Sequence, residues 1–436
     1  MKKTGNAKFL TALIIFSLTG QIAWVVENMY FNVFIYKMFH ASPADISAMV
    51  MASAVAATVT TLIMGALSDK LGKRKVFMAG GYILWGVSIL SFAFIRTDTV
   101  GRLFPAAAVS AVCVTLVIIM DCVMTFFGST ANDACFNAWL TDSTTHESRG
   151  AAEGINAMMP LVAILCVFGG FMGFDLNQSE SWTTIFLIIG IAVTVIGVLG
   201  FFLIDEPHKK ADGTDHYFAN IIYGFRPSVM KQNPLLYLLL IAFALFGISI
   251  QIFMPYLILY YTEGLKMEGY VLIMAPAIIL ASVFTVIWGR VHDKVGFRAS
   301  MLPSLGLLCL GYILLFFFRS TALVFAGSLL MMCGYLAGTA VFGAVIRDYT
   351  PEGRAGMFQG LRIAGQVLIP GIIGPAIGAW VLRDAETVIG DDGTESFIPN
   401  QNIFLAALIA AAVLGLFLTL LLYIMKRKTA KEATHE

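Results

Sequence analysis

Long apolar stretches separated by short polar loops dominate the chain. A helix of about 20 mostly apolar residues crosses the hydrocarbon core of a bilayer, and twelve stretches reach that length. They cover residues 9–36, 44–67, 76–95, 104–140, 151–173, 183–204, 234–261, 269–288, 299–318, 322–346, 356–382 and 402–425. We therefore predict an all-α polytopic membrane protein with twelve transmembrane helices, of which the fourth is unusually long and tilted.

The composition supports this prediction. The 436 residues are 58% hydrophobic and 13% charged, with a mean hydropathy of +0.83, whereas soluble domains carry about 25% charged residues. The first stretch is too long for the core of a signal peptide and lacks a cleavage site, so we interpret it as a span. The sequence contains no catalytic, zinc-binding or nucleic-acid-binding motif. We therefore expect no enzyme, no cofactor, no metal and no nucleic-acid partner.

Basic residues orient the predicted spans. Of 28 Lys and Arg residues, 21 fall in loops on one side and six on the other, and Arg362 falls within a span. Because cytoplasmic loops carry the excess of basic residues, we predict that both termini are cytoplasmic. We expect a monomer that crosses the plasma (inner) membrane many times and contacts the lipid bilayer.

The longest predicted cytoplasmic loop divides the chain into two halves of six spans. We predict an N-terminal bundle over residues 1–204, a linker over 205–232 and a C-terminal bundle over 233–436. Residues 216–229 of the linker are half apolar, which predicts an interfacial helix. The outward loop over residues 384–400 is polar and contains glycine, so we expect it to be flexible.

One motif occurs in both halves, as GALSDKLGKRK at residues 65–75 and GRVHDKVGFR at residues 289–298. An offset of 224 residues relates Gly65 to Gly289, Asp69 to Asp293 and Gly72 to Gly296. A second offset, of 206 residues, relates Asp142 to Asp348, and Arg149 and Arg354 agree with it within one residue. Duplicated six-helix halves are how many transporters build a central site around which two bundles rock.

The residue types in these loops suit contacts that hold one conformation closed. Gly65 allows two helices to approach, Gly72 allows a tight turn, and Asp69 can accept bonds from helix N-termini and basic residues. We expect Lys73, Arg74 and Lys75 at the lipid surface. The predicted gating residues are Gly65, Asp69, Gly72, Arg74, Gly289, Asp293, Gly296, Arg298, Asp142, Arg149, Asp348 and Arg354.

The two loops resemble the signature loop of the major facilitator superfamily, and the plan of twelve spans in two pseudo-symmetric halves extends this resemblance over the whole chain. The segment GQIAWVVENMYFN at residues 20–32, together with GALSD at 65–69, is similar to the glycoside–pentoside–hexuronide:cation symporters and their sucrose-carrier relatives. Cation-binding members of that branch place acidic residues in the second span. Here that span holds only Asp45, at its outer edge, which argues against sodium coupling.

Polar side chains within the first span form a candidate solute site. Gln21, Trp24, Asn28 and Asn32 follow one another at i, i+3, i+7 and i+11, which places them on one helical face. An indole and amides suit a sugar, because hydroxyls need donors and acceptors and the apolar face of a pyranose stacks on Trp. Alternatively, these amides join helices within the bundle.

Three carboxylates within the predicted spans, Glu27, Asp121 and Asp133, are candidates for coupling. Burial disfavours the charged form of a carboxylate, so each could exchange a proton as access alternates, although Asp133 also fits a structural role. The remaining candidates for solute binding are Asn137, Asn156, Gln251, Gln359, Arg362 and Gln366.

Two of these candidates and a group of tyrosines leave alternatives open. Arg362 shares a face with Gln366 and is always charged, so it requires a fixed acidic partner or an anionic solute. Three tyrosines near the end of the seventh span fit either an outer gate or a belt of interfacial aromatic residues; these are Tyr256, Tyr260 and Tyr261.

Three functions fit these features. The first is a secondary transporter that moves a sugar or glycoside together with a proton or monovalent cation. The second is a proton-driven exporter of drugs or metabolites, which the 21 Met and 34 Phe residues suit. The third, a membrane sensor or integral-membrane enzyme, is disfavoured by the repeated loops. We prefer the first, because amides and an indole share one face of the first span.

Overall fold

The computed structural model describes residues 3–104, 108–144, 146–205, 223–267, 269–351, 355–389 and 393–432. Almost all of these residues are helical. The chain divides into two compact units, of which unit 1 comprises Met1–Phe218 with Thr387–Ser396 and unit 2 comprises Ala219–Glu386 with Phe397–Glu436. The first six predicted spans therefore lie in unit 1 and the last six in unit 2.

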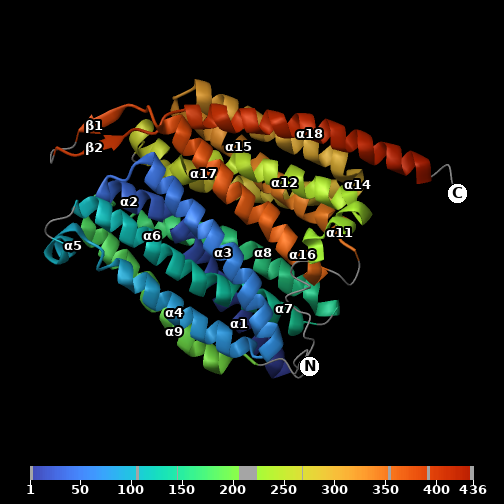
Figure 1. Ribbon diagram of the computed structural model, residues 1–436, viewed down its shortest axis with the longest axis horizontal. Coiled ribbons are helices and arrows are strands. Elements are labelled where there is room, and N and C mark those ends of the chain that lie inside the picture. Colours follow the sequence, from blue (N-terminus) through green and yellow to red (C-terminus); the bar gives the residue numbers. More distant parts are fainter. Residues whose placement is uncertain are drawn as a thin grey trace. The chain divides into compact units, whose positions relative to one another are not determined.

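Unit 1 begins with three helical segments that continue one another as a single span, α1 (Lys3–Val25), η1 (Val26–Tyr30) and α2 (Phe31–Phe39). Next come α3 (Pro43–Leu71), α4 (Arg74–Phe92) and the short α5 (Thr97–Leu103). The fourth span is also composite, with α6 (Val109–Gly128), η2 (Ser129–Phe136) and α7 (Asn137–Asp142), and α8 (His146–Phe171) and α9 (Ser179–Leu203) complete the unit. Within it, α6 lies beside α3 and α4, and α4 packs along α9 (Figure 1).

Unit 2 opens with η3 (Tyr223–Phe225) and α11 (Pro227–Gln232). Its first span joins α12 (Pro234–Phe253), η4 (Met254–Tyr256), α13 (Leu257–Leu259) and η5 (Tyr260–Gly264). The others are α14 (Tyr270–Phe317), α15 (Thr321–Tyr349), the composite α16 (Ala355–Ile363), η6 (Ala364–Leu368) and α17 (Ile369–Leu382), and finally α18 (Asn402–Glu432). Strands β1 (Thr387–Ile389) and β2 (Glu395–Phe397) pair between α17 and α18.

The predicted all-α fold with twelve transmembrane helices is confirmed. Eleven helical stretches among the described residues are long and apolar enough to cross a membrane. One of them, α14, contains 48 residues and is broken at Gly296, whose φ of 76° and ψ of 179° are not helical. Each arm of α14 can cross separately, because about 20 residues suffice.

Two local expectations were wrong. The fourth span begins at Val109, after the separate helix α5, rather than near residue 104. The outward loop over residues 384–400 contains a β-hairpin, which His40 holds through hydrogen bonds from its ring to Ser396 Oγ (2.7 Å) and Thr394 Oγ1 (3.0 Å). The described part of that loop is therefore ordered, because its backbone and its hydroxyls both have partners.

The tyrosines near the end of the seventh span are not an interfacial belt. Tyr256, Tyr260 and Tyr261 are at most 1% exposed. Tyr260 donates to the carbonyl of Leu315 at 3.1 Å, and the hydroxyls of Tyr261 and Ser328 lie 2.5 Å apart. These rings therefore fill the interior of unit 2, and the hydroxyls of Tyr260 and Tyr261 are hydrogen-bonded within it.

Glycines set how closely α4 and α9 approach. A Cβ atom at Gly86 of α4 would lie 2.2 Å from Thr194 Oγ1, 2.5 Å from Thr194 N and 2.6 Å from the carbonyl oxygen of Gly190. Two of these atoms belong to the backbone of α9, so they cannot move aside without shifting the helix. By contrast, a Cβ atom at Gly80, on the same helix, would meet nothing within 4 Å.

We predict that Gly86→Ala destabilises unit 1 by about 1–3 kcal/mol, the usual effect of overpacking. Gly80→Ala is the matched control and should leave stability unchanged or slightly improved. Thermal unfolding of the detergent-purified protein measures both. Equal melting temperatures for the two variants would contradict the close packing of α4 on α9.

Candidate functional site

Several candidate residues lie at π-helical turns. Among the described residues such turns are η1, η2, η5 and η6. Three of them interrupt a predicted span, and η5 lies at the end of one. A π turn accommodates one extra residue, which changes the direction of the side chains on either side, and it is often found at functional sites. Glu27 and Asn28 lie in η1, Asp133 in η2 and Gln366 in η6.

Side chains of the third and fourth spans hold Trp24 in place. The Trp24 indole N–H donates to Asn132 Oδ1 at 3.3 Å, and its ring lies 5.0 Å from the ring of Trp85. Asn132 Nδ2 donates to the Tyr82 hydroxyl at 2.8 Å, and that hydroxyl donates to the carbonyl of Phe16 at 2.7 Å. Because the only polar group of the indole is used inside the protein, only the ring surface of Trp24 is left for other contacts.

Two glycines make room for this arrangement. A Cβ atom at Gly20 would lie 2.3 Å from Asn132 Nδ2, and one at Gly128 would lie 2.7 Å from the Trp85 ring and 3.0 Å from the Trp24 ring. Sequence reasoning identified Trp24 but missed Tyr82 and Trp85. Neither residue belongs to a recognisable sequence motif. Both reach Trp24 or its partners only through side-chain contacts between α4 and the first span.

The predicted polar face of the first span is only partly preserved. Asn28 is exposed and Gln21 and Trp24 are half-buried, but Asn32 is 1% exposed. Asn28 Nδ2 donates to the carbonyl of Trp24 at 2.8 Å, and Asn32 Nδ2 donates to the carbonyl of Asn28 at 3.2 Å. The turn η1 lies between Trp24 and Asn32 and breaks the regular spacing, so Asn32 points into the protein.

Glu27 and Asp121 come together in the interior of unit 1. Glu27 Oε1 accepts hydrogen bonds from Ser53 Oγ and Thr125 Oγ1, both at 2.8 Å, and Asp121 is close enough to Glu27 for electrostatic interaction. Glu27 is 6% exposed and Asp121 is 1% exposed. We call these four residues, Glu27, Ser53, Asp121 and Thr125, the carboxyl cluster.

The carboxyl cluster lacks compensating charge. Glu27 Oε2 and Asp121 Oδ1 have no hydrogen-bond partner among the described residues, and no basic side chain there forms an ion pair with either carboxyl group. Two buried carboxylates without a cation are costly to ionise together. The arrangement is therefore chemically suited to hold a proton or a small cation.

The second span contributes Ser53 rather than an acidic residue to this cluster. Asp45 instead closes the start of α3, because its Oδ2 accepts from the backbone N–H and the hydroxyl of Ser42 at 2.9 Å and 2.7 Å, while its own N–H donates to Ser42 Oγ at 3.2 Å. This reciprocal pairing is a capping box, so Asp45 has a structural role at the helix end.

The other polar candidates of unit 1 are already partly bonded. Asp133 is half-buried and its Oδ2 accepts from Ser129 Oγ at 2.9 Å, while the exposed Asn137 donates to the carbonyl of Asp133 at 2.9 Å. Asn156 Oδ1 accepts from Ser17 Oγ, which joins α8 to α1. In this state Asn156 serves helix packing, whereas Asn137 remains accessible to a solute.

The first copy of the repeated loop contains a buried ion pair. Arg74, at the start of α4, is 5% exposed, and both its Nε and its Nη2 lie 3.3 Å from Asp142 Oδ2. Its Nη1 donates to Ser68 Oγ, and Ser68 donates to the carbonyl of Gly65 at 3.0 Å. The expectation that Arg74 lies at the lipid surface was therefore wrong, because Asp142 and Ser68 satisfy it in the interior.

The second copy of the repeated loop, residues 289–298, is held by different contacts. Asp293, Arg298 and Asp348 are all exposed. The offset of 224 residues places His292 where the first copy has Ser68, and His292 Nδ1 forms a 2.7 Å hydrogen bond with Ser300 Oγ. Ser300 Oγ also donates to the carbonyl of Gly296 at 2.8 Å.

Glycine conformation is the feature that the two copies share. Gly72 and Gly296 have φ angles of 62° and 76°, in the left-handed region that favours glycine. Gly65 and Gly289 also lie within helices, and a Cβ atom at Gly65 would lie 3.9 Å from the Ala134 side chain. The side chains of Asp69, Arg149 and Gln359, and all of Arg354, lie outside the described residues.

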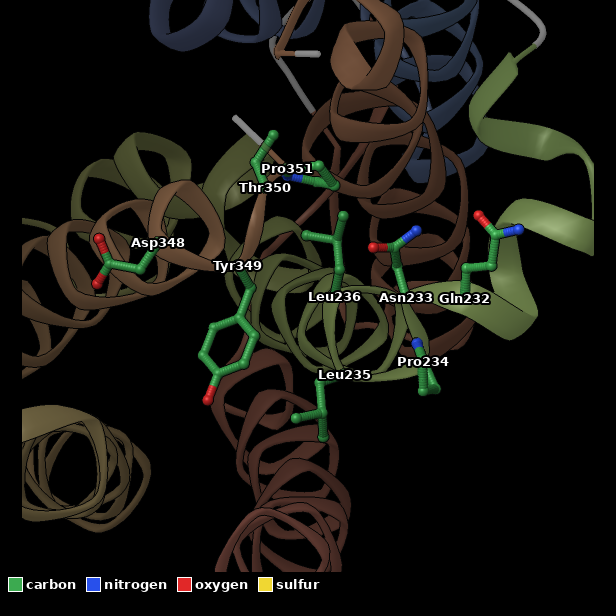
Figure 2. A pocket seen from close by; sticks show the side chains of 9 residues that line it. All are labelled: Gln232, Asn233, Pro234, Leu235, Leu236, Asp348, Tyr349, Thr350 and Pro351. Carbon is green, nitrogen blue, oxygen red and sulfur yellow. The ribbon is translucent and has the colours of Figure 1, made fainter. Parts of the chain in front are cut away.

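A hollow of about 410 Å³ lies in unit 2, where α12 begins and α15 ends. Figure 2 shows Asp348 on the opposite side of this hollow from Gln232 and Asn233. Its other lining residues are Pro234, Leu235, Leu236, Tyr349, Thr350 and Pro351. Asp348 is the one predicted gating residue among its lining residues, and none of the predicted solute-binding or coupling residues lines it.

The sequence profile of the Major Facilitator Superfamily matches residues 9–338 and 272–436. The chain belongs to this superfamily. The twelve helices and the two related loops are thus those of a transporter fold, and the chain is a membrane protein of the transporter class.

Two curated relatives match part of the chain. The Sugar efflux transporter B of Salmonella typhimurium is 26% identical over 199 residues, which is 46% of each protein. The MFS antiporter QDR2 of Candida albicans is 24% identical over 232 residues, or 52% of this chain and 41% of the relative. The chain thus spans less than half the length of either relative.

Solved structures of transporters share the fold along nearly the whole chain. A bacterial homologue of the lysosomal transporter Spinster has a TM-score of 0.71 with 16% identity, covering 97% of each chain. A D-xylose–proton symporter has a TM-score of 0.67 with 13% identity, covering 93% of this chain and 97% of its own. At such identities the likeness concerns the fold alone.

We predict that Arg74→Gln destabilises the protein by about 3 kcal/mol or more, because it leaves Asp142 buried without its partner. Arg298→Gln, at the equivalent place of the second copy, should change stability by less than about 0.5 kcal/mol, since Arg298 is exposed. Thermal unfolding compares the two variants. Similar losses would mean that the two copies are closed in the same way.

Proposed function

We propose that this chain is a secondary transporter that moves a small polar solute, a sugar or glycoside, by alternating access coupled to a proton or monovalent cation. In this proposal both termini are cytoplasmic, the membrane is the plasma (inner) membrane, and a monomer suffices. The six-helix bundles are residues 1–204 and 233–436, and residues 205–232 link them.

The observation that carries the proposal is how hydrogen bonding and ring packing hold the Trp24 side chain. Its indole N–H is bonded to Asn132 at 3.3 Å and one ring neighbour is Trp85. Trp24 is half-buried, with Gln21 three residues before it and Asn28 four residues after it on the same span. A ring surface next to amide groups suits a molecule with one apolar face and several hydroxyls. The resemblance of residues 20–32 to the glycoside–pentoside–hexuronide symporters and the name of the Salmonella relative support the same solute class.

The carboxyl cluster supports ion coupling. Glu27 is three residues after Trp24 on the same span, so binding of solute and binding of a proton act on one segment of backbone. Asp121 is the second carboxyl group of the cluster, and Asp133 lies on the same composite span as Asp121. In our proposal Glu27 and Asp121 share the coupling ion, and Asp133 is a secondary candidate.

Proton-driven export of drugs or metabolites is the second candidate function. It is favoured by the names of the two curated relatives, an efflux transporter and an antiporter. The same carboxyl cluster would serve either direction, because a proton can drive symport or antiport. Counterflow of labelled sugars and of a cationic dye in proteoliposomes separates the two functions.

We predict that Trp24→Ala weakens sugar binding at least about tenfold, because the stacking surface is lost, whereas Asn28→Ala has a smaller effect. Trp380→Ala is the matched control, since Trp380 is 63% exposed at the far end of α17. A thermal-shift screen of a sugar panel identifies the ligand, since stabilisation rises with occupancy. Unchanged affinity in Trp24→Ala would remove Trp24 from the solute site.

We predict that Glu27→Gln abolishes uphill accumulation but preserves exchange of solute across the membrane, because exchange requires no net ion movement. Asp121→Asn should behave in the same way, and Glu180→Gln, at the exposed start of α9, is the control. Proteoliposomes with and without an imposed proton gradient measure both activities. Accumulation by both cluster variants would exclude the carboxyl cluster from coupling.

A further inference from the structure

Arg362 carries a charge within a membrane span. It lies in the stretch Gly360–Leu382, near the end of α16, and its side chain is exposed. A guanidinium group remains protonated in proteins, and placing it against hydrocarbon is costly. Its exposed side chain is therefore best accommodated by a polar, water-accessible space.

No carboxylate compensates Arg362 among the described residues. No ion pair is formed by its side chain there, and the charged group that acts on it is Arg347, of the same sign. Two neighbouring positive charges without an acidic partner repel each other. An anion brought to this place would be attracted by both.

The guanidinium group is oriented by its own helix. Arg362 Nε donates to Gln366 Oε1 at 3.2 Å. This bond uses the inner edge of the group and leaves the two terminal nitrogens, Nη1 and Nη2, without a partner among the described residues. Those two nitrogens form the fork that binds carboxylate or phosphate oxygens in pairs.

Close packing keeps this segment in place. A Cβ atom at Gly374 of α17 would lie 2.4 Å from Gln251 Cβ, and one at Gly247 of α12 would lie 2.7 Å from Pro370. Gln251 thus supports the segment through its position on α12. The π turn η6, which contains Gln366, continues directly into this packed helix, and Arg362 lies on the helix that precedes η6, so the orientation of Arg362 does not depend on a long loop.

We propose that Arg362 binds an anionic group, a carboxylate or a phosphate, of the transported solute. The inference rests on the proposed function, which it deepens: the solute would be an acidic sugar or a sugar phosphate rather than a neutral sugar. Arg362 supplies the charge and the fork, and Gln366 positions them.

Thermal unfolding of the purified full chain tests this proposal. The probes are phosphate, glucuronate and glucose 6-phosphate, compared with glucose and with sodium chloride at equal ionic strength, because salt screens non-specific attraction. At least one of the three anions should stabilise the protein, and Arg362→Gln should weaken its binding by about 10- to 100-fold, as expected for a charged hydrogen-bonded contact. Arg362→Lys keeps the charge without the fork and should be intermediate.

Arg383→Gln is the matched control. Arg383 directly follows α17, is exposed and pairs with Asp384, so its loss should leave anion binding unchanged. The proposal is overturned if no anion stabilises the protein beyond chloride, or if the anion effect persists in Arg362→Gln. Stabilisation by neutral sugars alone would contradict the anion subsite but agree with sugar transport. Arg362-dependent binding of phosphate without any sugar binding would support the anion subsite but contradict sugar transport.

Discussion

The absence of water from the hydrocarbon core is the constraint on which the structure depends, because every polar group there needs a partner within the protein. Hydroxyls meet it by bonding to their own helix, as Thr58 does to the carbonyl of Ala54 and Ser282 to that of Ile278, at 2.8 Å and 2.7 Å. Against this background, polar atoms left without partners are informative. Among the described residues such buried atoms are Glu27 Oε2, Asp121 Oδ1, Asn32 Oδ1, Trp85 Nε1 and Thr262 Oγ1. Two of the five belong to the carboxyl cluster, which is why our proposal places the coupling ion there.

The duplicated loops show how two related halves have come to differ in chemistry. The first copy buries the charges of Arg74 and Asp142, so moving these helix ends apart would separate an ion pair in a region of low dielectric constant. The second copy relies on the hydrogen bond between His292 and Ser300, whose hydroxyl can rotate to another acceptor. Opening the second copy should therefore require less energy than opening the first, although both use a glycine with positive φ to make the turn.

Span number and fold class could be predicted from sequence because bilayer thickness fixes helix length and leaves a simple apolar signal. The direction of individual side chains could not be predicted from sequence, because it depends on local interruptions of the regular α-helix. Asn32 leaves the predicted face at the turn η1, and no residue type in VENMY signals a π turn. Arg74 is buried because Asp142, 68 positions away, reaches it. Ser53, Tyr82 and Trp85 could not be predicted for the same reason, since each contacts a site residue on another helix.

In the proposed function, the first span connects recognition of solute to ion coupling. Trp24 stands before η1 and Glu27 within it, while Trp24 is fixed to the third and fourth spans through Asn132 and Trp85. Glu27 is fixed to the second and fourth spans through Ser53 and Thr125. A change in the π turn therefore alters the direction of Glu27 relative to Trp24 and strains both sets of bonds. Under our proposal, loss or gain of an ion at Glu27 would change the same hydrogen bonds and would thereby link ion binding at Glu27 to solute binding at Trp24.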